Sequence, residues 1–190
     1  MDMFKELERG SFGYTNKKKN RQLAQVFLFL GVGVLMFIVG LFLHNFDKAN
    51  FITMLAILMV LPMTKAFVIF VVLFPYKSVS KELYDEVSGK VSANAILMTD
   101  MVITSPDKPM GLSFVVISDT QVLCMLGKAK QDVAYIENYL KESLANNKIE
   151  GFTVKVYDDY GKFLNIIGTR DYEKTSKQEE CFKYIRTLVV

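Results

Sequence analysis

Two long runs of apolar residues dominate the first half of the chain. Residues 22–43 contain no charged side chain, and residues 50–74 contain only one, Lys65. A helix needs about 20 apolar residues to cross the core of a bilayer, so each run predicts a membrane span. The connection between them, His44–Asn50, is only seven residues long. The two spans are therefore predicted to form an antiparallel helical hairpin.

The first run is predicted to be a retained span rather than a cleaved signal peptide. Its polar leader is 21 residues long, and the run exceeds the apolar stretch of about 7–15 residues that signal peptides carry. No small-residue cleavage motif follows it, because the run ends in LFLHNFDKAN.

The remaining residues, 76–190, alternate short apolar runs with turn residues, which is typical of a globular domain. Ser80 is a candidate N-cap, and the sequence of Ser176 and Glu179 has the form of a capping box. The elements expected in chain order are a helix in 78–89, strands at 95–104, 112–118 and 121–126, a helix in 131–147, two strands within 152–168 and a helix from 176 onward. The order αβββαββα predicts an α+β domain that follows the transmembrane α-helical hairpin.

The turns of this domain are also predicted from the sequence. Residues 105–111 form a loop because of their proline and glycine content, and Asp119-Thr120 joins two apolar runs as a hairpin turn. Tyr160-Gly161 is expected to join the two strands within 152–168, with Asp158-Asp159 as solvated turn residues rather than metal ligands.

The distribution of charge predicts the orientation of the hairpin. Residues 1–21 hold six Lys or Arg against three acids, and Lys17, Lys18, Lys19 and Arg21 lie next to the first span. The short connection holds one lysine. Since positive residues favour the cytoplasmic side, both termini are predicted to be cytoplasmic. The same basic cluster is a candidate contact for anionic lipid head groups.

The expected organisation is therefore a basic cytoplasmic arm (1–21), a transmembrane hairpin (22–75) and a cytoplasmic domain (76–190). The domain holds 15 Lys or Arg against 16 acids. This near-neutral balance shows no strong electrostatic footprint for nucleic acid, so no nucleic-acid partner is expected.

Lys65 is the candidate functional residue of the membrane part. An ionisable side chain inside a span is by default a candidate site. Pro62, three residues earlier, removes one helical N–H donor, and Thr64 is a candidate to bond a carbonyl group that this change frees. Two interpretations stay open: Lys65 extends to the membrane surface, or it lines a polar notch beside the proline.

Small residues predict how the two spans pack. Gly31, Gly33 and Gly40 lie in the first span, and Gly33 and Gly40 are seven residues apart and so share one helix face. Such residues let helices approach closely, either within the hairpin or in a homo-oligomer.

Few side chains are candidates for catalysis. The single histidine, His44, lies in the connection between the spans, and Cys124 and Cys181 are isolated thiols in apolar contexts. No Gly-rich phosphate loop or metal-binding cluster occurs in the sequence. No cofactor, metal or catalytic residue is therefore expected.

The first six elements of the domain, αβββαβ, resemble the core order of the restriction-endonuclease-like fold, including nuclease-related domains. That resemblance implies an acidic residue on the second strand and an acid-x-Lys motif on the third. Lys128 fits the lysine, but Leu126 stands in place of the acid and Ser113 lies near the other acidic position. Asp100 and Asp119 are nearby acids with a different spacing, so the metal site of that family is expected to be absent.

Three short motifs resemble a family of small uncharacterised two-span membrane proteins of Gram-positive bacteria. They are ERGSFGY before the basic cluster, LPMTKAF within the second span and FPYKS directly after it. The resemblance covers most of the chain and implies a membrane location, two crossings and a role for Lys65.

These observations predict a multi-pass protein of the cell membrane that holds a non-catalytic interaction or sensor domain at the cytoplasmic face. Its expected partners are the lipid bilayer and, through the spans, either another protein or further copies of the chain. Two alternatives stay open: a membrane-tethered nuclease-like hydrolase with a rearranged site, and an oligomeric pore or transporter subunit.

Overall fold

The computed structural model describes residues 8–43, 50–127, 131–168 and 172–190. These residues divide into two compact units. The hairpin unit comprises Lys17–Pro75, and the domain unit comprises residues 8–16 together with Tyr76–Val190. This division differs from the predicted one at the N-terminus, because residues 8–16 bond to the sheet of the domain rather than forming a separate arm.

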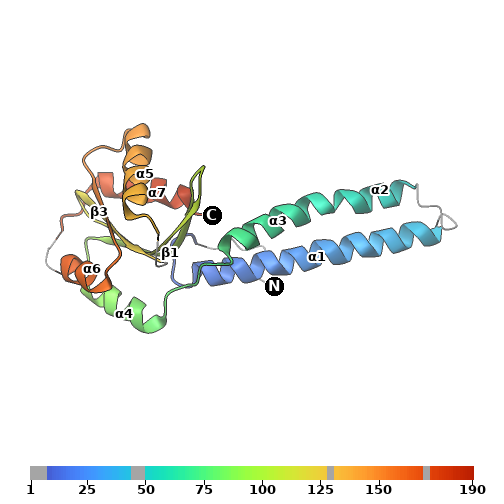
Figure 1. The fold of residues 1–190 in the computed structure, drawn as a ribbon, viewed down its shortest axis with the longest axis horizontal. Helices are drawn as coiled ribbons and strands as arrows, with labels where there is room; N and C mark the ends of the chain where they lie inside the picture. The colour runs from blue at the N-terminus through green and yellow to red at the C-terminus, as the bar shows by residue number, and fades with distance from the viewer. Residues whose placement is uncertain (1–7, 44–49, 128–130, 169–171) are drawn as a thin grey trace. The chain divides into compact units, whose positions relative to one another are not determined.

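The hairpin unit has two helices that are long and apolar enough to cross a membrane. The first is α1 (Tyr14–Leu43), and the second is formed by α2 (Phe51–Leu58) and α3 (Val60–Leu73), which run beside α1 (Figure 1). Few residues in either apolar stretch are buried, so their apolar side chains face outward, unlike those of a helix inside a soluble core. Most of the predicted connection, 44–49, lies outside the described residues.

The predicted glycine face is confirmed. A Cβ atom on Gly40 would lie 3.0 Å from Asn50 Oδ1 and 3.2 Å from Ile52 Cβ, and one on Gly33 would lie 3.4 Å from Met59 Cβ. Both glycines therefore allow α1 to approach the second span closely, whereas Gly31 has no neighbour within 4 Å of its Cβ position. Asn50 fixes one end of this contact, since its side chain accepts from Thr53 N–H and donates to the Gly40 carbonyl.

The second span is interrupted near its middle. Met59 separates α2 from α3, and its N–H bonds the carbonyl of Ala56, three residues back. Pro62 explains the break, because it has no N–H to offer the preceding turn. Thr64 Oγ1 donates to the Val60 carbonyl at 2.8 Å, which is not the Leu58 carbonyl that Pro62 leaves without its usual donor.

The domain unit is built on one mixed sheet with the strand order β1-β2-β3-β4. Strands β1 (Ile96–Thr104), β2 (Pro109–Ile117) and β3 (Gln121–Leu126) are antiparallel, and β4 (Thr153–Tyr157) runs parallel to β3. The helix α5 (Val133–Asn146) provides the crossover from β3 to β4. A bulge at Leu112–Phe114 shifts the β2–β3 register by one residue, so Ser113 is the extra residue.

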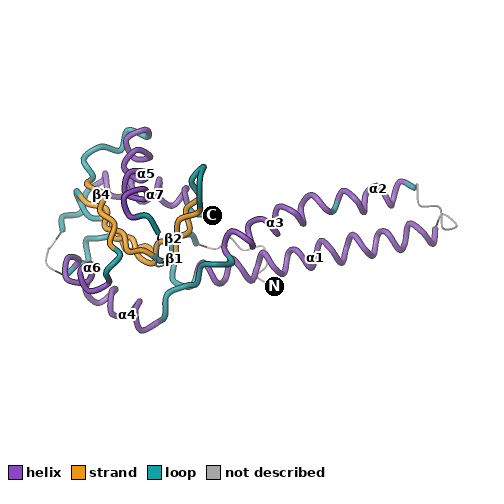
Figure 2. The backbone as a smooth tube through the Cα atoms, in the orientation of Figure 1, coloured by secondary structure: helices purple, strands orange, loops and turns teal. Residues whose placement is uncertain are grey.

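Helices cover both faces of this sheet (Figure 2). The helices α5 and α7 (Ser176–Leu188) pack on one face, where the core includes Ile136, Leu140 and Ile185. The helices α4 (Lys81–Lys90) and α6 (Tyr160–Ile167) pack on the other face. The sheet is therefore buried on both sides, which explains why β1 and β2 are nearly continuous apolar runs.

The predicted order αβββαββα is correct except at its seventh element. Residues 160–167, expected to include a strand, form α6 instead. Asp159 caps this helix by accepting from Lys162 N–H at 2.9 Å. Phe163, Leu164 and Ile167 then lie on one buried face, a spacing that fits a helix and not a strand. The predicted turn at Tyr160-Gly161 is the first turn of this helix.

Caps and turns expected in the domain form at three places. Ser80 caps α4 through Leu83 N–H, the turn at Asp119-Thr120 joins β2 to β3, and α5 ends at Asn146 as expected. The capping box at Ser176 is wrong: the N-cap of α7 is Thr175, without a side-chain bond. Gln178 anchors this end of the helix instead, by donating to the carbonyls of Asn94 and Ile117.

Candidate functional site

The main polar feature inside the domain unit is Asp100, in the middle of β1. Its side chain is 3% exposed, and its backbone has a positive φ of 54°. Oδ2 accepts from the N–H of Gly13 at 2.6 Å, and Oδ1 accepts from the N–H of Val79 at 2.7 Å. We call this arrangement of Asp100, Gly13 and Val79 the Asp100 clamp.

The Asp100 clamp joins the two segments that lead to and from the hairpin in the sequence. Gly13 directly precedes α1, and Val79 follows α3 by six residues. Further bonds link the same segments: Thr15 Oγ1 donates to the Asp100 carbonyl at 2.8 Å, and Asn16 and Ser78 bond each other's side chain through their backbone N–H groups. Asp100 thus bonds both the segment before α1 and the segment after α3.

The segment before α1 also extends the edge of the sheet. Thr99 N–H donates to the Gly10 carbonyl at 2.8 Å, and Tyr14 Oη donates to the Val190 carbonyl at 2.6 Å. Gly10 and Gly13 both have φ of 79°, a conformation that glycine adopts at little cost. A Cβ on Gly10 would lie 2.6 Å from Met98 Cε, so the closeness of this segment to β1 depends on that glycine.

Burial dominates the electrostatics of the Asp100 clamp. Desolvation raises the pKa of the Asp100 carboxyl above its usual value, and the hydrogen bonds from Val79 and Gly13 lower it by less. The ionised form is thus penalised by burial and partly compensated by two backbone donors.

The space beside the Asp100 clamp is too small for a ligand. The cavity there measures about 10 Å³, which is at most the volume of one water molecule. It is closed on one side by the ring of Tyr76, which lies where a Cβ of Gly111 would be, and Tyr76 Oη donates to the Pro109 carbonyl at 2.8 Å. Gln131 bonds both the N–H and the carbonyl of Gly111.

Two residues compared with the nuclease-like pattern, Asp100 and Ser113, line the same small cavity. In the register of β1 and β2, Asp100 lies opposite Ser113, between the paired residues Thr99–Phe114 and Met101–Leu112. Gly127 also lines the cavity. Asp119 instead lies in the β2–β3 turn, and Lys128 lies outside the described residues. Across the part of the chain that the structure describes, no group of three His, Cys, Asp or Glu is placed to hold a metal ion.

The two cysteines are both free and buried within the domain core. Burial raises the pKa of the Cys181 thiol to about 12 and also raises that of Cys124. Since the thiolate is the reactive form, both thiols are protected from ordinary reagents in the folded domain.

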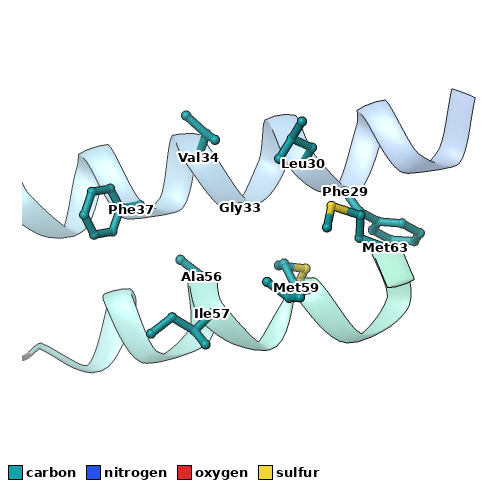
Figure 3. A pocket seen from close by; sticks show the side chains of 10 residues that line it. Phe29, Leu30, Gly33, Val34, Phe37, Ala56, Ile57, Met59 and Met63 are labelled. Carbon is teal, nitrogen blue, oxygen red and sulfur yellow. The ribbon is translucent and has the colours of Figure 1, made fainter. Parts of the chain in front are cut away.

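A second hollow lies within the hairpin unit. It measures about 240 Å³, and it is lined by Phe29, Leu30, Gly33, Val34, Phe37, Ala56, Ile57, Met59, Val60 and Met63. Figure 3 shows that α1 contributes the aromatic side chains, while Met59 and Met63 come from the region of the helix break. The hollow is open and almost wholly apolar, which suits a hydrocarbon environment.

The predicted membrane residues are placed as follows. Lys65 lies on α3, is exposed, and does not line the apolar hollow. Pro62 lies in the first turn of α3 beside the helix break. Lys17, Lys18, Lys19 and Arg21 all lie in the first turns of α1. The structure therefore does not bring Lys65 and the basic cluster into one site.

Sequence reasoning missed the Asp100 clamp. Asp100 is visible as an acid within an apolar strand, but the donors that it binds are backbone groups far away in the sequence. The pair of glycines in ERGSFGY was the available signal, because a glycine before a helix often marks a special backbone conformation.

No protein-family model, curated protein or solved structure matches this chain.

Proposed function

We propose that the protein is an integral membrane protein that holds an interaction or sensor domain at the cytoplasmic face of the cell membrane. The Asp100 clamp carries this proposal. A carboxylate in the middle of the edge strand β1 accepts one bond from the segment before the first span and one from the segment after the second. Any change in the spans that moves either segment acts directly on β1.

The membrane location is supported by the contrast between the two units. Apart from Leu83, every exposed large apolar side chain of the described residues lies between Leu23 and Phe74. Such a continuous apolar surface is unfavourable in water and favourable in lipid. The excess of lysine and arginine before the uncharged run 22–43 supports cytoplasmic termini.

Cysteine labelling in intact cells tests the orientation. Asn45→Cys places a thiol in the connection between the spans, and Lys155→Cys places one on an exposed position of β4. We expect a membrane-impermeant maleimide to label only Asn45→Cys before permeabilisation and both variants afterwards. Because Cys124 and Cys181 are buried, the unsubstituted chain serves as the unlabelled control. Labelling of Lys155→Cys in intact cells would contradict a cytoplasmic domain.

Hydrogen exchange in bilayers of different thickness tests the sensor role. A span that is too long or too short for its bilayer tilts or strains at a cost of fractions of a kcal/mol per Å. We expect peptides that cover 8–16, 76–80 and β1 to exchange about fivefold faster in a mismatched nanodisc, whereas α5 is unaffected. In Asp100→Asn the response of β1 should be lost. Equal exchange in thin and thick bilayers would rule out this coupling.

The nuclease-like hydrolase is the second candidate function. In its favour, Asp100 lines the same cavity as Ser113, which lies near a position where the nuclease-like resemblance implies an acid. Against it, the Asp100 carboxylate is bonded to two backbone donors, and the cavity has room for at most one water molecule. Metal and substrate would both require the Asp100 clamp to open, so the interaction or sensor role is the better supported of the two.

A further inference from the structure

Lys65 presents its charge on the outer face of the second span. Its neighbour Ala66 is buried in the hairpin unit, whereas Lys65 is exposed. Within the described residues Lys65 forms no hydrogen bond or ion pair, and α1 carries no acidic side chain between residues 22 and 43. The described residues of the hairpin unit therefore provide no counter-ion for this lysine.

The depth of Lys65 argues against contact with water or lipid head groups. Lys65 lies eight residues before Leu73, the end of α3, which is about 12 Å at about 1.5 Å per residue. A lysine side chain reaches only about 6 Å beyond its Cα. In addition, side chains on a helix tilt towards its N-terminus. For Lys65 that direction leads towards the middle of the span, so extension to the near surface is geometrically unfavourable.

The residues around Lys65 form a regular face that another helix can pack against. Leu58, Leu61 and Val68 are all exposed and lie at the 3–4 spacing that brings them onto the same face as Lys65. We call these four residues the Lys65 face. Among its three apolar residues, Leu61 is the most exposed, at 69%.

We propose that the Lys65 face binds a transmembrane helix of another protein, and that an Asp or Glu side chain within that helix pairs with the Lys65 ammonium group. Charged residues inside membranes pair with one another or with backbone carbonyls, and a carboxylate is the partner that neutralises the charge of an ammonium group. A second copy of this chain does not supply it, because neither span contains an acid, and two facing Lys65 side chains repel each other. The proposal rests on the proposed membrane location.

A synthetic transmembrane peptide tests this chemistry directly. The probe is a Leu/Ala-rich helix with a single Asp at the depth of Lys65, and the comparison peptide carries Leu at that position. Both are mixed with the labelled full chain in zwitterionic phospholipid vesicles, and association is measured by energy transfer. We expect the Asp peptide to associate at least about 10-fold more strongly than the Leu peptide.

Three variants separate charge from shape. Lys65→Met keeps a long flexible side chain and removes the charge, so it should lose the preference for the Asp peptide. Lys65→Arg keeps the charge and should retain it. In Lys65→Glu the preference should reverse towards a peptide that carries Lys. Equal association of the Asp and Leu peptides with the unsubstituted chain would overturn the proposal.

Two further measurements distinguish the ways in which this test can fail. Resistance of the chain to alkaline extraction from the vesicles reports insertion, so a chain that is extracted contradicts the proposed membrane location itself. If the chain is inserted and adding anionic lipid abolishes the preference for the Asp peptide, then a lipid phosphate is the partner of Lys65 and the proposed protein partner is wrong. Preference for the Asp peptide in both lipid mixtures supports the helix partner.

Discussion

Asp100→Ala is expected to destabilise the domain unit by about 3 kcal/mol. The substitution leaves the N–H groups of Gly13 and Val79 without their acceptor, and each buried donor without a partner costs about 1–3 kcal/mol. Alanine is also unfavourable at the φ of 54° that Asp100 adopts, by about 1–2 kcal/mol. Relief from burying a charge offsets part of this loss.

The measurement is hydrogen exchange of the full chain in detergent micelles. A loss of 3 kcal/mol corresponds to an increase of about 100-fold in the exchange of β2 and β3. Asp100→Gly is the matched control, because glycine tolerates the positive φ and removes only the two acceptor bonds. Asp100→Gly should be more stable to unfolding than Asp100→Ala by about 1 kcal/mol. An effect below 1 kcal/mol for Asp100→Ala would mean that the Asp100 clamp does not hold the two segments.

The raised pKa of Asp100 adds a signature in pH. Because the pKa is above its unfolded value of 3.8 in the folded state, the folded chain retains a proton that the unfolded chain releases. The stability contributed by this group is present below about pH 3.8 and is lost as the pH rises through the folded pKa. The difference in the free energy of unfolding between the unsubstituted chain and Asp100→Asn should therefore change between pH 3.8 and the folded pKa of Asp100. At higher pH this difference should be constant.

The spans and most domain elements are predictable because their signals are local. A helix that crosses a membrane needs a long uncharged run, and residues 22–43 and 50–74 supply one each. The buried stripe of α5 and the N-cap of α4 likewise depend on residues within one or two turns. Gly33 and Gly40 were assigned to one face by spacing alone, and the structure places the second span there.

The Asp100 clamp was not predictable because its bonds are long-range. The Gly13–Asp100 bond joins residues 87 apart in the sequence, and it uses a backbone donor that every residue except proline carries. No periodicity or residue type therefore identifies the pair. The charge of residues 1–21 predicts a basic arm, although Gly10, Gly13 and Thr15 contribute to the domain through backbone and hydroxyl groups.

Long-range contacts also explain why residues 160–167, expected to include a strand, form α6 instead. Its apolar run is too short to distinguish a strand from a helix by periodicity, and the decisive contacts are tertiary. Phe163 and Leu164 are adjacent and both buried. In a strand, they would point to opposite faces of the sheet. On α6, both pack against the face of the sheet that carries Phe114 and Leu123.

Phe163→Ala is therefore expected to destabilise the domain unit by about 3–5 kcal/mol, the usual cost of removing a fully buried aromatic ring. Phe163 is 0% exposed, and its ring stacks on that of Phe114 with the centroids 6.2 Å apart. It also contacts Tyr157 of β4 with the centroids 6.2 Å apart. Loss of the ring leaves a cavity where α6, β2 and β4 meet, so exchange of the helix and of both strands should increase together.

Two variants show whether this cost comes from the packing of α6 on the sheet. Phe163→Leu retains most of the buried volume and should cost less than about 1.5 kcal/mol. Lys162→Ala, at the exposed neighbour, should leave the exchange of β2 and β4 unchanged. A strand at these positions would bury Phe163 and Asn165 on one side and Leu164 on the other. In that case Leu164→Ala and Phe163→Ala would loosen the packing on opposite faces of the sheet. Packing through α6 requires both substitutions to loosen the packing on the face that carries Phe114.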